Sequence, residues 1–77
     1  MTYEEARVLA ETHPNLPEHW YNFAEVCREV GNRLEALMLY QKVIDLDPNR
    51  AEFYLGRLRE FCTPKELREI RVPAPVV

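Results

Sequence analysis

The residue types that most often bind metals or act as nucleophiles are few in this chain: His13, His19, Cys27 and Cys62. A zinc site needs such ligands at short, regular spacings. Here a turn with two prolines separates the histidines, and Cys27 falls within a pattern of residues expected to be buried. The spacing therefore predicts no metal site. The same two cysteines are too few for a disulfide framework and are typical of a reducing compartment.

The sequence also gives little support for covalent or acid–base catalysis. The chain contains no serine and two glycines, Gly31 and Gly56, which excludes a serine nucleophile and a glycine-rich phosphate loop. Asp and Glu number thirteen, but they are scattered over helical segments, with no sign of the apolar pocket that raises the pKa of a general acid. We therefore expect a protein that is not an enzyme and needs no cofactor.

Length, composition and charge indicate which general class of protein this is. The 77 residues have room for one small domain, and 47% hydrophobic with 30% charged residues is typical of a globular chain. A net charge of −3 weighs against nucleic-acid binding, which needs a basic face. No apolar stretch approaches the roughly 18 residues of a membrane helix, and the first twenty residues lack the order of a signal peptide. These features predict a cytoplasmic protein without membrane contact.

Local signals predict an all-α fold, because Pro, Gly and Asn cut the sequence into helical lengths and no stretch alternates as a strand does. Pro17, Gly31-Asn32 and Asp47-Pro48 mark helix boundaries, and Thr63 with Glu66 forms a capping box. The expected helices span Thr2 to His13, Pro17 to the Gly31-Asn32 stop, about Arg33 to Leu46, Asn49 (as a cap) to Cys62, and Thr63 to Ile70 or Arg71. Leu34 is among the residues that the third of these helices is expected to bury. The helical domain is thus 1–71, and 72–77 is an extended tail.

An internal period organises these helices. Pro14 and Pro48 lie thirty-four residues apart, and so do Trp20 and Tyr54. A repeat of this length is typical of helical-repeat proteins, in which each helix pair buries its apolar face against the next pair.

The residues within one period carry a recognisable motif. It reads Trp20-x-x-Phe23-Ala24-x-x-Cys27, then Ala36-x-x-x-Tyr40, then Pro48. This pattern resembles the tetratricopeptide repeat family. The resemblance implies one full repeat over 17–50, preceded by the second helix of one repeat and followed by the first helix of another. It departs from the family at Cys27, where tyrosine is usual, and at Arg57, which stands one period after Phe23.

The resemblance implies antiparallel helix pairs in a right-handed solenoid, with a short capping helix at the C-terminal end. It also implies a non-catalytic interaction module that binds a partner's peptide or helix in an inner groove. The implied groove residues are Glu18, Tyr21, Asn22, Glu25, Arg28, Glu29, Glu52, Leu55 and Arg59. Their four acids and two bases favour a partner that carries Lys or Arg, and Tyr21 is expected to be an exposed aromatic.

Apolar residues at the ends of the stack support an alternative. One full repeat is too few to bury a continuous core, so we expect apolar side chains to be left open at one end of the stack. Leu37, Met38 and Leu39 are the candidates at one end, and Leu67 and Ile70 at the other. These surfaces predict a building block that self-associates into a homo-oligomer, unless the last helix covers the core by itself.

Overall fold

The computed structural model describes residues 1–74, and these residues fold into helices connected by short turns, with no strand among them. The all-α prediction is confirmed. The elements are α1 (Tyr3–Thr12), α2 (Pro17–Glu29), α3 (Arg33–Leu46), a 3₁₀ turn η1 (Pro48–Arg50), α4 (Ala51–Arg59) and α5 (Pro64–Glu69).

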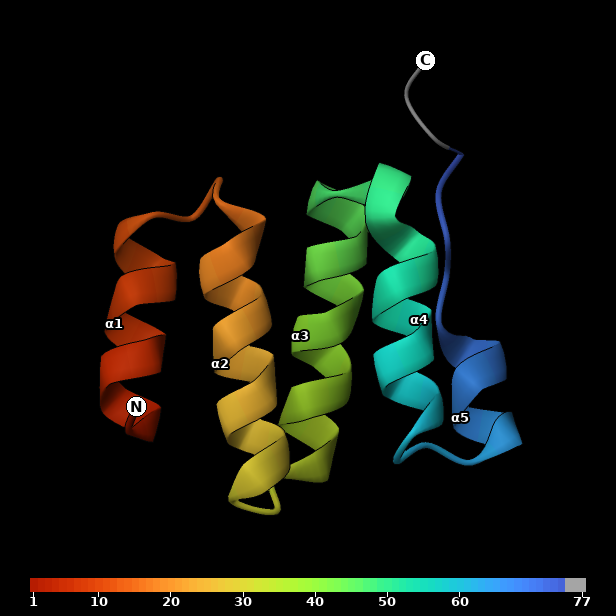
Figure 1. Ribbon diagram of the computed structural model, residues 1–77, viewed down its shortest axis with the longest axis horizontal. Coiled ribbons are helices and arrows are strands. Elements are labelled where there is room, and N and C mark those ends of the chain that lie inside the picture. Colours follow the sequence, from red (N-terminus) through yellow and green to blue (C-terminus); the bar gives the residue numbers. More distant parts are fainter. Residues whose placement is uncertain (75–77) are drawn as a thin grey trace.

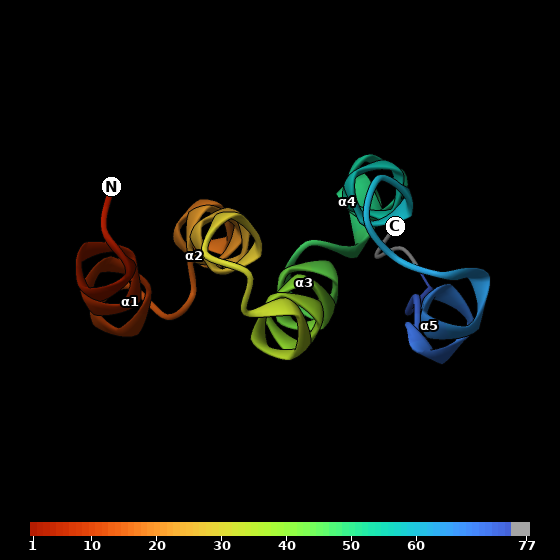
Figure 2. The ribbon, with the colours of Figure 1, turned by 90° about the horizontal axis from the view of Figure 1, so that it is seen from below.

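The helices stand side by side in chain order, each antiparallel to the one before it (Figure 1). Viewed along the helix axes they form two rows, with α2 and α4 in one row and α1, α3 and α5 in the other (Figure 2). The Cα atoms of this assembly span 30 × 30 × 15 Å. The longest helix, α3, has 14 residues, and within residues 1–74 no helix has the length and apolar character needed to cross a membrane.

Side chains cap the first and last helices. The Thr2 hydroxyl accepts the backbone N–H of Glu5, and the Glu5 carboxylate accepts the N–H of Thr2 in return. Thr63 and Glu66 form the same reciprocal pair at the start of α5. Each pair satisfies two backbone donors that a helix start leaves free. The predicted cap at Thr63 is therefore confirmed.

Gly31 ends α2 as predicted. Its φ of +83° lies in the left-handed region that only glycine enters without strain. The conformation lets the Asn32 N–H reach back to the carbonyl of Cys27 at 2.8 Å, which satisfies a carbonyl at the end of the helix. The sharp reversal brings α3 antiparallel to α2.

The start of α4 differs from the prediction. Asn49 lies inside the 3₁₀ turn, α4 begins at Ala51, and no side chain caps it. The predicted Asn49 cap is wrong because the turn closes with a backbone bond from Arg50 to the carbonyl of Asp47. The helix also ends at Arg59, where tighter backbone bonds take over, rather than continuing to Cys62.

The core lies between the two rows of helices. Ala24 and Ala36 are fully buried, and their small side chains let helix axes approach closely. The complete set of buried residues is Ala6, Ala10, Phe23, Ala24, Val26, Cys27, Ala36, Leu39, Tyr40, Val43, Ile44, Ala51, Tyr54 and Leu58.

Helix α3 corrects the predicted pattern of burial. Leu39, expected on an open apolar end, is buried, whereas Leu34, expected in the core, is 73% exposed. The reason is that α3 packs against α2 and against α4, so its buried stripe is wide and its orientation follows from tertiary packing. A nearly continuous apolar sequence does not reveal that orientation.

Candidate functional site

The predicted groove residues lie on α2 and α4, the two helices that share a row (Figure 2). The exposed ones are Glu18, Asn22, Glu29, Glu52 and Arg59, and the half-buried ones are Tyr21, Glu25, Arg28 and Leu55. The structure thus brings the set onto the two helices of one row, but four of its members are partly occupied by contacts within the protein.

Glu25 bridges three helices. Its carboxylate accepts the hydroxyl of buried Tyr40 on α3 and the guanidinium of Arg57 on α4. Burial, and then the hydrogen bond to Glu25, raise the pKa of the Tyr40 hydroxyl. Arg57 is the residue that departs from the repeat pattern one period after Phe23, and its long side chain spans the gap between α2 and α4. Glu25 therefore holds the face together rather than standing free for a ligand.

Arg28 makes a second cross-helix contact. It donates to the Glu60 carboxylate at 3.2 Å, and its guanidinium lies 4.8 Å from the centre of the Phe61 ring. Arg57 pairs with the same Glu60 at 3.2 Å. These charged groups form a network that links α2 to the end of α4.

Tyr21 is half-buried, which corrects the expectation of an exposed aromatic. The centre of its ring lies 6.0 Å from that of Tyr40, 5.8 Å from Phe53 and 5.7 Å from Tyr54. Burial raises the pKa of the Tyr21 hydroxyl. The ring therefore packs between α2, α3 and α4, with part of its surface left accessible.

A hollow opens beside Tyr21, at the end of the protein where α2 and α4 begin and α3 ends. We call it the aromatic hollow. Its volume is about 180 Å³, and its lining residues are Pro17, Glu18, Tyr21, Asp47, Arg50, Phe53 and Tyr54.

The sequence predicted Glu18 and Tyr21 for this region but missed Asp47, Arg50 and Phe53. The 3₁₀ turn brings these three beside α2, and the Asp47-Pro48 signal predicted the end of α3 but not the 3₁₀ turn that follows it. The Tyr54 hydroxyl donates to Asp47 at 3.0 Å, and burial followed by this hydrogen bond raises the pKa of Tyr54 to about 12.

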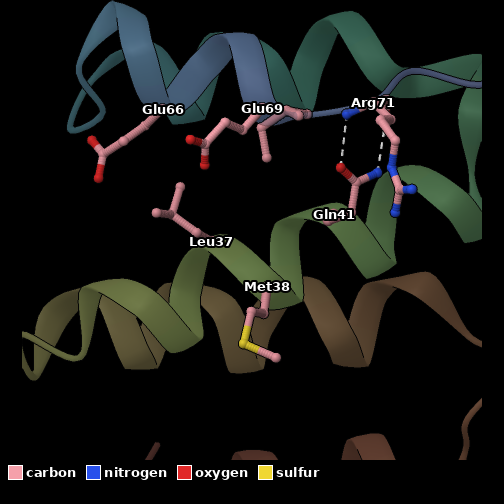
Figure 3. A pocket seen from close by; sticks show the side chains of 7 residues that line it. Leu37, Met38, Gln41, Glu66, Glu69 and Arg71 are labelled. Carbon is pink, nitrogen blue, oxygen red and sulfur yellow. Dashed lines mark hydrogen bonds between the residues drawn. The ribbon is translucent and has the colours of Figure 1, made fainter.

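A second hollow lies between α3 and α5, with a volume of about 350 Å³ (Figure 3). Leu37, Met38 and Ile70 all line it. The prediction that Leu37 and Met38 lie at one end of the stack and Ile70 at the other is therefore wrong. Because α5 folds back beside α3, the two sets meet. Leu67 is half-buried and packs against the core.

Polar contacts bind α5 and the residues just after it to α3 beside this hollow. The side-chain amide of Gln41 accepts the N–H of Arg71 and donates to its carbonyl, both at 2.8 Å (Figure 3). Arg33 on α3 pairs with Glu66 on α5. The Arg33 contact and the capping bond to Thr63 lower the pKa of Glu66 to about 2.

The third hollow is an open, mostly apolar surface of α1, lined by Glu4, Glu5, Val8 and Leu9, with a volume of about 450 Å³. Val8 is 50% exposed. Helix α1 lies at the N-terminal edge of the protein (Figure 1).

The residues with potential metal or nucleophile chemistry are placed as follows. The His13 and His19 rings stack with their centres 5.2 Å apart, although the turn separates them in sequence. The buried Cys27 thiol donates to Glu35 at 3.3 Å, and its burial raises its pKa to about 12. A thiol held protonated is a poor nucleophile and ligand. Within residues 1–74, His, Cys, Asp and Glu side chains do not gather in any group of three that would suit a metal ion.

Residues one period apart play matching parts. The Trp20 indole N–H donates to the carbonyl of Pro14 at 2.9 Å, and the Tyr54 hydroxyl donates to the carboxylate of Asp47. Both side chains thus reach from the first half of their helix back to the turn that precedes it. The partners differ, since Trp20 contacts a backbone carbonyl and Tyr54 a side-chain carboxylate, but both residues contact the segment before their helix.

A scan against protein-family models, a search of curated proteins and a search of solved structures each found no match to the chain. The arrangement of its own residues is accordingly the basis for a function.

Proposed function

We propose that this chain is a non-catalytic protein-interaction module of the tetratricopeptide type, which binds a peptide or helix of a partner along the face formed by α2 and α4. In this proposal α2 and α3 are one complete repeat of a right-handed solenoid. Helix α1 is the second helix of a preceding repeat, α4 the first helix of a following one, and α5 a short cap. The proposed compartment is the cytoplasm, which suits the free Cys27 and Cys62.

The observation that supports the proposal is the similar placement of α2 and α4. They share a row (Figure 2), and Trp20 and Tyr54 make matching contacts to the preceding turns. Two helices in one row offer a partner a shared surface, the kind of surface with which helical repeats bind extended ligands.

The chemistry of this surface supports the same reading. Exposed Asn22 offers an amide that donates and accepts hydrogen bonds, and Phe53, 50% exposed, offers an apolar contact. On the same face, the Glu25–Arg57 and Arg28–Glu60 pairs link α2 to α4 and to the residue that follows α4. A face that is already held in place loses little conformational entropy when a ligand binds.

A display selection tests the proposal. Random twelve-residue peptides are selected on the immobilised protein and counter-tested on two double variants of equal charge change. Asn22→Arg with Glu52→Arg alters exposed positions of the α2–α4 face, and Leu34→Arg with Glu69→Arg alters exposed positions of the other row. We expect enriched peptides that lose at least ten-fold in affinity on the first variant and keep their affinity on the second. No enrichment, or loss on the second variant alone, contradicts the proposal.

Self-association is the second candidate, and exposed apolar residues of α3 favour it. Leu34 and Met38 lie one helical turn apart, and each is 73% exposed. An apolar pair of this kind at the surface is typical of an interface. Sedimentation equilibrium over about two decades of concentration tests it. A defined oligomer that Met38→Glu dissociates would support self-assembly, and a 9.1 kDa monomer throughout would exclude it.

A further inference from the structure

We infer that the aromatic hollow accepts a basic side chain, arginine or lysine, from the partner peptide. The inference rests on the proposed function and deepens it, because it names the side chain that the α2–α4 face would read. Neither the repeat pattern nor the predicted groove residues single out this hollow. Five of its seven lining residues come from outside the predicted set.

The walls of the hollow suit a cation with an aliphatic stem. The Tyr21 and Phe53 ring centres lie 5.8 Å apart with the planes 52° from each other. A cavity of about 150 Å³ is known to hold a benzene-sized ligand, so a hollow of about 180 Å³ has room for one side chain. Aromatic faces attract ammonium and guanidinium groups, and the stems of Lys and Arg bury well against apolar rings.

The charges at the rim favour the same ligand. Two carboxylates, Glu18 and Asp47, face one guanidinium, that of Arg50. Glu18 is exposed and forms no ion pair with any of residues 1–74. Asp47 uses one oxygen to accept the Tyr54 hydroxyl. A cation entering the hollow would meet a net negative environment.

Arg50 shows that a guanidinium group can contact the Phe53 ring. Its guanidinium carbon lies 5.6 Å from the centre of the Phe53 ring, within the usual range for cation–π contact. The protein's own arginine thus already uses this ring. Because Arg50 also repels an incoming cation, its removal should strengthen binding of a basic ligand and weaken binding of an acidic one. This opposite sign makes Arg50 the most informative position.

The test uses small blocked amino acids rather than a peptide, so that it measures binding of a single side chain. The ¹⁵N-labelled full chain is titrated with N-acetyl-arginine methylamide and N-acetyl-lysine methylamide. N-acetyl-norleucine methylamide and N-acetyl-glutamate methylamide serve as apolar and acidic comparisons. We expect the two basic compounds to shift the backbone amides of Tyr21, Arg50 and Phe53, and the other two to shift them far less.

Charge-changing variants then test how Arg50 and Glu18 affect the affinity. Arg50→Gln should tighten binding of the arginine compound, and Glu18→Gln should weaken it, each by roughly two- to five-fold, as expected for one exposed charge. Arg68→Gln and Glu69→Gln make the same charge changes at exposed positions of α5, in the other row, and should leave the affinity within experimental error. Circular dichroism checks that each variant keeps its helical content.

Three results would overturn the inference: stronger shifts with the glutamate compound together with loss of binding in Arg50→Gln, equal shifts with norleucine, or shifts confined to the α3–α5 hollow. These outcomes are separate from failure of the proposed function. Basic compounds that bind in the hollow while no displayed peptide is enriched would count against the peptide-binding face alone. Enriched peptides that lack Lys and Arg would count against the inference alone.

Discussion

Helices α3 and α5 lie in the same row, but they are attached to the protein by different kinds of contact. Five residues of α3 are buried, including Tyr40, Val43 and Ile44, with no accessible surface at these three. None of the six residues of α5 is buried. Instead α5 is held by the Arg33–Glu66 pair, the bonds from Gln41 to Arg71 and the packing of half-buried Leu67 against the core.

The difference indicates where stability resides. Burial of apolar side chains supplies most of the folding free energy, whereas exposed ion pairs and hydrogen bonds contribute little each. We therefore expect the α2–α3 pair to unfold only with the whole protein and α5 to open locally at lower free energy.

The largest effect is expected from a cavity in the α2–α3 core. Ile44→Ala should lower the free energy of unfolding by about 2 to 5 kcal/mol, because Ile44 is fully buried. Leu67→Ala removes a side chain of similar size from half-buried α5 and should cost clearly less. Urea denaturation of both variants measures the difference, and equal losses would contradict the contrast between the two helices.

Overpacking between helices should be the next largest effect. Ala36 has no accessible surface, so Ala36→Leu should destabilise the protein by about 1 to 3 kcal/mol. The reverse change at an exposed position of the same helix, Leu34→Ala, should stay within about 0.5 kcal/mol. A stable Ala36→Leu protein would mean that α2 and α3 are not in close contact there.

Local structure could be predicted from the sequence where neighbouring residues determine it. The bounds of α3, the Gly31 stop and the Thr63–Glu66 cap each depend on a few adjacent residues, and all three are as predicted. The orientation of α3 could not be predicted, because an almost continuous apolar run has no clear face. Leu34 and Leu39 were therefore assigned the wrong way round.

Contacts between residues far apart in the chain could not be predicted from the sequence either. The Glu25–Arg57 bridge joins residues 32 positions apart, and the aromatic hollow depends on a 3₁₀ turn that the Asp47-Pro48 signal did not predict. The Gln41–Arg71 contact, 30 positions apart, depends on the path of the chain after α5. Periodicity located the helices that form the proposed face, but not which of its side chains are already engaged.

A smaller effect is expected where the chain leaves α5. Gln41→Leu removes both bonds to the Arg71 backbone and should change the global free energy of unfolding by less than about 1 kcal/mol, because the contact is exposed. The Arg71 amide should nevertheless exchange with solvent faster, while exchange in α2 and α3 stays unchanged. Uniformly faster exchange throughout the protein would show that α5 is not a separate local unit.

The smallest effect concerns pH. The folded-state pKa of Glu66 is about 2, against an ordinary value of 4.5, so its contacts stabilise the folded state fully above about pH 4.5. This contribution is lost as the pH falls toward 2. The difference in unfolding free energy between the parent and Glu66→Gln should therefore shrink from pH 6 to pH 2. Glu69→Gln, an exposed carboxylate of the same helix, is the control, and a difference that does not vary with pH would remove the role assigned to Arg33.

The most direct test of the proposed function is to map a selected peptide on the protein. Backbone amide shifts of the ¹⁵N-labelled chain are recorded with and without the tightest peptide from the display selection. The proposal predicts shifts concentrated in α2 and α4, including Asn22 and Glu52, and small changes in α1, α3 and α5. Shifts centred on Leu34, Met38 and α5, with α2 and α4 unchanged, would contradict it.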